Sequence, residues 1–279
     1  MRLTKESLQI NPSATEQRIS RFVKDYTRKV GAEGVVLGVS GGLDSATTAA
    51  LCSRSLGAKK VQALFMPERE TYTETDEEHA RLLAEKFGFL MKKVDITDSL
   101  HALYKAIPDY ESKDILSRGN LKARIRMLIW YYYANNKRLI VVGSSDKSEA
   151  MLGYFTKWGD ASADIAPIMD LYKTQVSQLA LHLEIPLEII KKSPTPALWP
   201  GQTAESELGL KYEVLDLILY GFEHFMDCQT IADQLDLTTQ TVEGVKKRWL
   251  QTEHKRQMPL TCKLEFRTVT NDFRLSRNR

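Results

Sequence analysis

Short apolar segments alternate with longer segments of helical periodicity along most of the chain. Strand-like apolar runs occur at 34–39, 60–66, 89–94 and 138–143. Between them, apolar residues recur at helical spacing over 42–56, 74–87 and 117–136. Strands that alternate with helices are typical of βαβ units. The pattern therefore predicts an α/β fold, a doubly wound and mostly parallel sheet with helices on both faces.

Further helical patterns lie on either side of this region. An amphipathic pattern at 15–30 predicts a helix before the first strand. Segment 193–209 is rich in proline and lacks periodicity, which predicts a long ordered or substrate-gated loop. Helical patterns at 211–220, 229–235 and 238–252 predict a small C-terminal helical unit. A frayed, basic segment is expected after it.

The turn after the first strand is the most informative stretch of the sequence. Ser40–Ser45 reads Ser-Gly-Gly-Leu-Asp-Ser and leads directly into a helix. A strand, a glycine turn and a helix N-terminus bring several backbone N–H groups together, which predicts a phosphate site. Gly41 and Gly42 let the backbone approach an anion, while two serine hydroxyls add donors. The spacing matches neither a Walker A motif nor a dinucleotide-binding fingerprint.

Asp44 lies within this predicted phosphate loop. A carboxylate beside a triphosphate would be repelled unless a divalent cation lies between them. The alternative is an ordinary Gly-rich turn in which Asp44 is a favourable charge in the first helical turn. The six specified residues in a strand-to-helix context favour the phosphate loop with a metal ligand.

The predicted helix at 117–136 carries both polar and aromatic candidates. Asn120 is placed to cap it, and Arg124 and Arg126 project from its first turns. Its later part, Leu128–Tyr133, is apolar on nearly every side. Such a helix is buried in a core or in a subunit interface, and we favour an interface.

Polar residues also follow the fourth strand. Ser144 is placed to touch a nucleotide, and Glu149 to join Asp44 on a magnesium ion. Alone, Glu149 would be interpreted as a solvated helix carboxylate. Because parallel strands end at the same edge of a sheet, we expect it to face the phosphate loop.

The next loop and helix add further charged candidates. Lys157, Asp160 and Asp164 lie among small residues in 153–167, which suits a polar substrate better than a core. Lys173 begins a helix, where a cation is unfavourable unless an anionic ligand meets it. Read alone, Lys173 would be a solvated lysine.

Composition narrows the class of protein. The formal net charge is +3, too small to imply nucleic-acid binding by itself. No apolar run approaches the length of a membrane span, and the first residues lack a signal-peptide core. The three cysteines show neither zinc nor disulfide spacing, which indicates a reducing cytoplasm.

Taken together, these motifs resemble those of ammonia-dependent NAD synthetases, which are ATP pyrophosphatases with a PP-loop. The resemblance extends over nearly the whole chain, with the motif blocks in the family's order. The matching blocks are Ser40–Ser45, Gly119-Asn120, Ala123-Arg124-x-Arg126-Met127, Glu149-Ala150, Gly153, Phe155-Thr156-Lys157-x-Gly159-Asp160, Pro194-Thr195, Gly201-Gln202-Thr203, Glu207-Leu208-Gly209 and Glu253-His254-Lys255-Arg256.

The resemblance implies a reaction, a fold family and an assembly. NAD synthetases use ATP and Mg²⁺ to adenylate the nicotinate carboxylate of deamido-NAD, and ammonia then displaces AMP. The implied fold is of the adenine-nucleotide α-hydrolase type, in a homodimer. A single domain, 1–279, would comprise an N-terminal helical segment (1–33), the α/β core (34–192), an active-site loop (193–209) and the C-terminal helical unit and tail (210–279).

The resemblance also implies site residues. Asp44 and Glu149 would hold magnesium, and Asp160 would accept a proton from ammonium, with Lys173 as a second catalytic residue. The implied ATP-binding residues are Gly38, Val39, Ser40, Gly41, Gly42, Leu43, Asp44, Ser45, Ser144, Lys173 and Thr195. The implied deamido-NAD-binding residues are Arg124, Lys157, Asp164, His254 and Lys255.

The sequence departs from the family pattern at a few positions. Ser144 replaces the usual threonine but keeps the hydroxyl. Ala161 and Ala163 replace residues that are commonly glycine, so this loop is expected to be stiffer or differently folded. Ala204 replaces a frequent aspartate and leaves Glu205 as the carboxylate there, which puts a ligand role of that loop in doubt.

Two other interpretations compete with this one. Residues 231–248 have the spacing of a DNA-binding helix-turn-helix, although Glu243 lies on the would-be recognition helix and no basic arm flanks it. A compact helix pair that buries its apolar residues explains the same pattern, so we do not expect nucleic-acid binding. A tRNA-thiolating or GMP-synthesising pyrophosphatase would need cysteines or further domains that the sequence does not show.

The expected nitrogen donor is ammonia. Glutamine hydrolysis requires an activated nucleophile, normally a cysteine, and none of Cys52, Cys228 and Cys262 has a local amidase signature. The α/β core begins by residue 34, which leaves room only for a helix or two before it.

Overall fold

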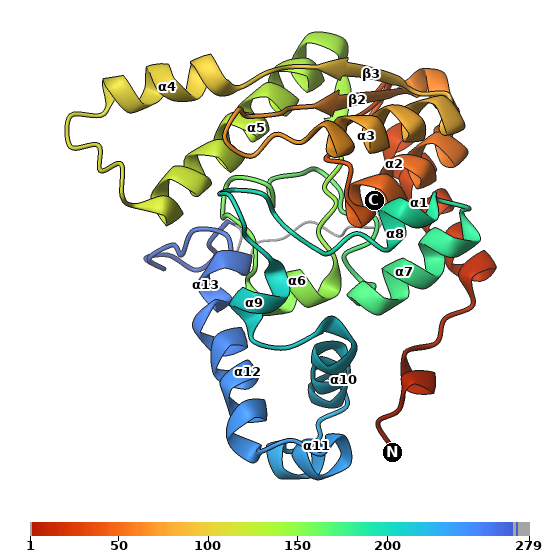
Figure 1. The fold of residues 1–279 in the computed structure, drawn as a ribbon, viewed down its shortest axis with the longest axis vertical. Helices are drawn as coiled ribbons and strands as arrows, with labels where there is room; N and C mark the ends of the chain where they lie inside the picture. Colours follow the sequence, from red (N-terminus) through yellow and green to blue (C-terminus); the bar gives the residue numbers. More distant parts are fainter. Residues whose placement is uncertain (1, 270–271, 273–279) are drawn as a thin grey trace.

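A parallel β-sheet lies at the centre of the computed structural model, which describes residues 2–269 and 272 (Figure 1). The strand order is β3-β2-β1-β4, and every paired strand runs parallel to its neighbour. The predicted α/β class and all predicted strands are confirmed. The strands are β1 Gly34–Gly38, β2 Val61–Phe65, β3 Leu90–Lys93 and β4 Leu139–Val141.

Helices cover both faces of this sheet, as predicted. Successive side chains of a strand point to opposite faces, so Val35 and Leu37 enter one core while Val36 enters the other. The first core contains residues of α1 Pro12–Lys29, α2 Leu43–Leu56, α3 Glu74–Phe87, α7 Lys173–His182 and α8 Leu187–Ile190. The second contains residues of α4 Thr97–Ala106 and α5 Ile115–Lys137. A 3-10 turn, η2 Ala58–Lys60, precedes β2.

A third apolar core lies in a smaller helical unit, which includes the predicted C-terminal helices (Figure 1). Leu3 and Leu8, from the start of the chain, belong to this core rather than to the sheet. The elements of the unit are η1 Lys5–Leu8, α6 Lys147–Leu152, α9 Ala204–Leu208, α10 Tyr212–Glu223, α11 Cys228–Leu235 and α12 Thr239–Gln251, followed by α13 Glu253–Arg256.

Two local predictions are wrong. Helix α5 begins at Ile115 and is capped by Asp114, whose side chain accepts a hydrogen bond from Ser117 N at 3.0 Å, so Asn120 does not cap it. Segment 193–209 is not a loop throughout, because its end forms helix α9, capped by Thr203. In both cases an Asp or Thr that the pattern did not single out caps the start of the helix.

The end of the described chain has no helix or strand after α13. Leu260, Leu264 and Phe266 expose 85% or more of their surface in this segment. Most of the basic end predicted from the sequence lies outside the described residues. No helix in the described part combines the length and apolar character needed to cross a membrane.

Candidate active site

A cavity of about 460 Å³ opens at the carboxyl edge of the sheet. Ser40, Pro67 and Gly143 follow β1, β2 and β4, and all three line it, as expected of residues at the carboxyl ends of parallel strands. Asn120 of α5 and the segment 192–199 close other sides of the cavity. Its volume is typical of a small-molecule site.

The loop after β1 is shaped by its own serines and glycines. Ser45 Oγ accepts a hydrogen bond from Ser40 N at 3.1 Å and donates one to Gly42 O at 3.1 Å. Gly41 has a φ of +78°, and a Cβ there would lie 2.5 Å from the carbonyl oxygen of Asp76. The turn therefore requires glycine. It leads into α2 so that the positive end of this helix faces the cavity.

Most of the predicted ATP-binding residues line this cavity together. Gly41 shapes the turn without lining the cavity itself. Thr195 is held in place because its Oγ1 donates to Gln202 O at 2.6 Å and accepts from Ala197 N at 3.1 Å. The predicted residues in the lining are Gly38, Val39, Ser40, Gly42, Leu43, Asp44, Ser45, Ser144, Lys173 and Thr195.

Lys173, the first residue of α7, places its ammonium group among three carboxylates. Its Nζ lies 2.6 Å from Asp44 Oδ2, 2.7 Å from Asp146 Oδ2 and 2.9 Å from Glu149 Oε1. Lys173 is only 4% exposed, so the interpretation of a solvated lysine does not hold. In this structure, protein carboxylates are the anions that meet this lysine at the start of its helix.

This carboxylate cluster, Asp44, Asp146 and Glu149, is strongly perturbed electrostatically. Burial raises the pKa of Glu149 well above its usual value, and the neighbouring Asp146 raises it further, while Lys173 opposes both effects. Burial likewise raises the pKa of Asp146. For Lys173 burial favours the neutral form, but the three carboxylates outweigh it and raise the pKa well above the usual value.

The carboxylate cluster also has the composition of a site for a hard divalent cation. One oxygen from each of its three members lies within 4.8 Å of the others. Asp44 Oδ1 is buried and has no hydrogen-bond partner among the described residues. Three carboxylates share one ammonium here, and a bound Mg²⁺ would favour their ionised forms and balance their negative charge. The donor set therefore fits magnesium.

Sequence reasoning missed Asp146. It caps α6 by accepting a hydrogen bond from Glu149 N at 2.8 Å and is fully buried beside Lys173. The signal was available, because an aspartate directly after a strand end and before a short helix is both a cap and a site candidate.

Asp160 lies on the cavity wall, as its predicted role requires. One of its oxygens accepts a hydrogen bond from Thr156 N at 2.8 Å. Burial raises the pKa of the Asp160 carboxyl, although the backbone hydrogen bond lowers it. Thr156 in turn donates to Asn120 at 2.7 Å, which fixes the loop against α5.

Hydrogen bonds link three of the five predicted deamido-NAD residues, and a fourth, Lys255, follows one of them in the sequence. Arg124 donates to Lys157 O at 3.2 Å, and Lys157 Nζ donates to His254 O at 2.5 Å. Lys255 lies beside the ring of Phe155 and lines the cavity, whereas the other three do not.

Asp164 lies apart from that group and does not line the cavity. Its Oδ2 accepts a hydrogen bond from Val141 N at 2.7 Å, which closes the end of β4. Its Oδ1 accepts a weaker one from Tyr131 OH at 3.4 Å. In this structure its contacts are those of a strand-end support.

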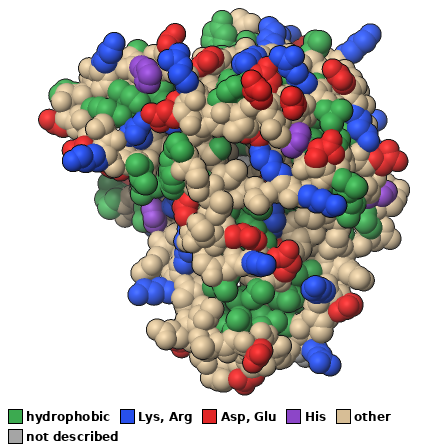
Figure 2. Space-filling view, in the orientation of Figure 1, with side chains coloured by type: hydrophobic (Ala, Val, Ile, Leu, Met, Phe, Trp, Pro, Cys, Tyr) green, Lys and Arg blue, Asp and Glu red, His purple; other side chains and the backbone are tan. Residues whose placement is uncertain are grey.

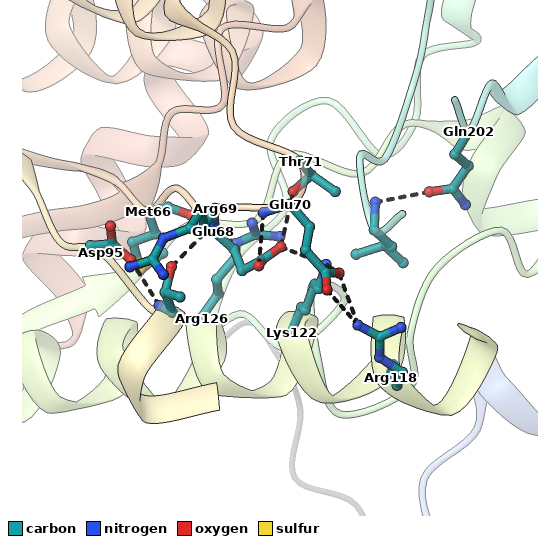
Figure 3. A network of polar contacts seen from close by, with 12 residues as sticks. Met66, Glu68, Arg69, Glu70, Thr71, Asp95, Arg118, Lys122, Arg126 and Gln202 are labelled. Atoms are coloured by element: carbon teal, nitrogen blue, oxygen red, sulfur yellow. Dashed lines mark hydrogen bonds and ion pairs between the residues drawn. The ribbon is translucent and has the colours of Figure 1, made fainter. Parts of the chain in front are cut away.

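A second buried ion pair supports the opposite wall of the cavity (Figure 3). Lys122 of α5 donates to Glu68 at 2.6 Å, and both side chains are 1% exposed. Nearby, Arg118 donates to both oxygens of Glu70 at 2.7 and 2.9 Å. Arg126 holds the carbonyl oxygen directly after β2 at 3.1 Å. Helix α5 thus fixes the segment after β2, a role that no local pattern indicates.

The packing of α11 and α12 agrees with the compact helix pair that the sequence also allowed. Ile231 and Val242 are fully buried between them, and Val245 is nearly so, as expected of a compact helix pair. On the face in Figure 2, Lys and Arg side chains are interspersed with Asp and Glu rather than gathered over these helices.

Comparison with known proteins identifies the family. The NAD synthase model matches residues 15–259. The chain belongs to the NAD synthase family. A relative from Hyperthermus butylicus, an NH(3)-dependent NAD(+) synthetase, is 43% identical over 261 residues, which cover 93% of this chain and 94% of the relative. One of the same name from Methanocaldococcus jannaschii is 44% identical over 246 residues, 88% and 94% of the two chains.

Solved structures of family relatives share the fold. The NMN synthetase from Francisella tularensis has a TM-score of 0.81 and 30% identity, covering 92% of this chain and all of its own. The NH3-dependent NAD synthetase from Campylobacter jejuni, in complex with nitrate, has a TM-score of 0.77 and 29% identity, covering 91% of this chain. These neighbours agree with the α/β fold of the NAD synthase family.

The buried pair of Lys122 and Glu68 generates a prediction. Lys122→Met should lower the free energy of unfolding by about 3–5 kcal/mol, because it leaves a buried carboxylate unpaired. The double variant Lys122→Met/Glu68→Gln should recover most of that loss. Urea denaturation of the two variants measures both values, and equal destabilisation by each would contradict the pairing.

Proposed function

We propose that this chain catalyses ATP-dependent amidation of deamido-NAD with ammonia, giving NAD, AMP and pyrophosphate. One observation carries the proposal: a phosphate-type loop and the carboxylate cluster with Lys173 line one cavity in a chain of the NAD synthase family. The names of its relatives from Hyperthermus butylicus and Methanocaldococcus jannaschii support the same reaction.

The chemistry of the substrate explains why ATP is needed. A carboxylate is a poor electrophile, and its conversion to an acyl adenylate makes AMP the leaving group that ammonia displaces. Negative charge builds on the transferred phosphate, so loop amides and Lys173 should stabilise it. Magnesium, held by Asp44 and Glu149 with Asp146 beside them, would supply charge neutralisation on the triphosphate.

Within this reaction we assign ATP to the phosphate loop and the surrounding wall. Residues Gly38–Ser45 would hold the phosphates, with Ser144 and Thr195 as further contacts. Lys173 would exchange one of its contacts in the carboxylate cluster for a phosphate oxygen. It is well placed for this exchange because its Nζ lies between those carboxylates and also lines the cavity.

Deamido-NAD would occupy the side of the cavity near α13. Lys255 lines the cavity there, and hydrogen bonds link Arg124, Lys157 and His254 nearby. The positive charges of the arginine and the two lysines suit a dinucleotide. For Asp164 we keep a substrate contact as a proposal that would need release of its bond to β4. Asp160, with its raised pKa, is our candidate for the group that takes a proton from ammonium.

Ammonia rather than glutamine is the proposed nitrogen donor. A glutamine-hydrolysing site needs a reactive thiolate, whereas the Cys52 thiol is fully buried and its burial raises its pKa to about 12. Cys228 and Cys262 have no basic partner among the interactions of the described residues. All three cysteines are free thiols, which suits the cytoplasm that we propose as the location.

We further propose a homodimer built on α5, with the whole chain as one catalytic domain. Leu128 and Tyr132 are 63% and 65% exposed and lie one helical turn apart. Arg124 lies one turn before them on the same face of α5. A second copy packed against this face would cover the apolar residues and lie next to the proposed deamido-NAD group.

The reaction can be tested directly. With ATP, Mg²⁺, ammonium and deamido-NAD, purified protein should form NAD, AMP and pyrophosphate in equal amounts, at rates that rise with pH as ammonium deprotonates. Glutamine freed of ammonia should give little turnover. Formation of ADP and orthophosphate, or equal turnover from glutamine, would refute the proposal.

A second substrate belongs in the same assay because one structural neighbour is an NMN synthetase with a TM-score of 0.81. This second substrate is nicotinate mononucleotide, which carries the same nicotinate carboxylate as deamido-NAD but lacks the second nucleotide. We expect a higher kcat/KM for deamido-NAD. The reverse preference would reassign the substrate while leaving the adenylation chemistry intact.

The metal assignment predicts the effect of neutralising its ligands. Asp44→Asn and Glu149→Gln should each lower kcat by about 100-fold or more, because charge on the triphosphate loses its screening. Asp170→Asn is a matched control, since this carboxylate near α7 is 96% exposed and pairs with Lys147. A magnesium titration in which either variant kept near-native activity would show that its assignment is wrong.

The dimer is tested by sedimentation velocity. The wild-type chain should sediment as a dimer at micromolar concentration, and the double variant Leu128→Lys/Tyr132→Lys as a monomer with reduced activity. Leu181→Lys, which changes an apolar residue of α7 that is 54% exposed, should remain dimeric. An active wild-type monomer would exclude this assembly.

A further inference from the structure

Helix α10 of the C-terminal unit places a buried carboxylate between two elements of the site. Asp216 is 0% exposed and lies near the middle of α10. Its Oδ1 accepts a hydrogen bond from Ser148 Oγ of α6 at 2.6 Å, and its Oδ2 accepts one from Thr174 N of α7 at 2.8 Å. Both oxygens are therefore used, each by a different helix.

The two partners of Asp216 are sequence neighbours of the charged cluster. Ser148 directly precedes Glu149, and Thr174 directly follows Lys173. Ser148 Oγ also accepts a hydrogen bond from Lys173 N at 3.1 Å, which ties the starts of α6 and α7 to each other. A single side chain thus fixes the backbone on either side of the Lys173–Glu149 ion pair.

Burial of the Asp216 carboxylate lowers the stability of the fold, so its presence in α10 needs an explanation. A buried carboxylate loses its hydration, and this burial raises the pKa of Asp216 to about 7, although Ser148 and Thr174 lower it. Apolar residues surround this part of α10 and would have filled the same space without that cost. The second oxygen faces the N-terminal turn of α7, where a negative charge is favourable.

We propose that Asp216 is a positioning residue for ATP activation: it aligns α6 and α7 so that Glu149 and Lys173 meet Asp44 at the wall of the cavity. The inference rests on the proposed function, because that function gives Glu149 and Lys173 their roles. The inference also assigns the C-terminal helical unit a role in the reaction. Through α10, this unit supports the phosphate side of the site.

Other contacts of α10 reinforce the same alignment. Tyr212, one turn before Asp216, places its ring 5.2 Å from Lys173 Nζ. Glu223, at the end of the helix, accepts hydrogen bonds from Tyr172 OH at 2.6 Å and from Lys147 Nζ at 3.0 Å. Contacts with the starts of α6 and α7 are therefore made from the first residue of α10 to its last.

The test compares Asp216→Asn with a matched variant of α7. Gln178 accepts a hydrogen bond from Ile10 N at 3.1 Å and donates one to Leu8 O at 2.9 Å. Like Asp216 it thus ties α7 to another element through two hydrogen bonds. Its third bond, to Thr174 O at 3.4 Å, stays within α7 and does not reach the carboxylates around Lys173. Gln178→Leu therefore controls for loss of stability without misalignment of the site.

Two measurements report alignment rather than stability. Binding of Mn²⁺-ATP, followed by electron paramagnetic resonance of Mn²⁺, should weaken about 10-fold to 100-fold in Asp216→Asn. The kcat for NAD formation should fall by a similar factor, while the KM for ammonium stays unchanged. Gln178→Leu should lower the urea midpoint yet keep wild-type values of all three quantities.

A folded Asp216→Asn variant with wild-type Mn²⁺-ATP affinity and kcat would overturn the inference. Losses of the same size in Gln178→Leu would overturn it too.

If Asp216→Asn does not fold, Ser148→Ala serves in its place, because it removes one of the two hydrogen bonds of Asp216. It should also weaken Mn²⁺-ATP binding and lower kcat, and wild-type values of both would contradict the inference. A wild-type chain that forms no NAD would refute the proposed function instead, and Mn²⁺-ATP binding would still test Asp216.

Discussion

The ammonium group of Lys173 lies within 2.9 Å of a carboxylate oxygen from each of Asp44, Asp146 and Glu149. These residues belong to the starts of α2, α6 and α7, so one cation joins three segments that are far apart in the sequence. Burying so many charges would cost several kcal/mol for each ion without mutual pairing. Because carboxylates outnumber the ammonium group, the site favours binding of a further cation. The positive N-terminal ends of α2 and α7 favour binding of phosphate beside it.

The sheet and the helical unit each supply half of this arrangement. Parallel strands bring Ser40, Pro67 and Gly143 to one edge, because right-handed crossovers return every strand in the same direction. The helical unit then holds α6 and α7 against that edge through α10 and its buried Asp216. On the other side, α5 fixes the segment after β2 through the Lys122–Glu68 pair. The cavity is thus rigid on the walls that face the phosphate loop, as preorganised electrostatic stabilisation requires.

Local patterns were sufficient for most of the fold. β1, β2 and β4 are largely buried apolar runs close to glycine or proline, so they could be located to within a residue or two. The edge strand β3 is mostly exposed, and its position was found from the apolar residues around its start. Helix α3 was predicted with the bounds that the structure has, because Thr73 and Gly88 mark its ends clearly. The start of α5 and the helix α9 were misjudged where competing caps, Asp114 and Thr203, lay outside the periodic pattern.

The sequence by itself determined the α/β class, the phosphate loop and the family, because these depend on residues that are close together in the chain. Only the tertiary structure decided which charges meet. Lys122 and Glu68 are 54 residues apart, and Lys173 and Asp44 are 129 apart. No periodicity links such positions, and the preference of a buried charge for a partner acts only after the chain has closed around it. For that reason Lys122 and Asp216 became visible as site supports only in the folded chain. Asp146 stood before a short helix as a possible cap, but its contact with Lys173 also became visible only there.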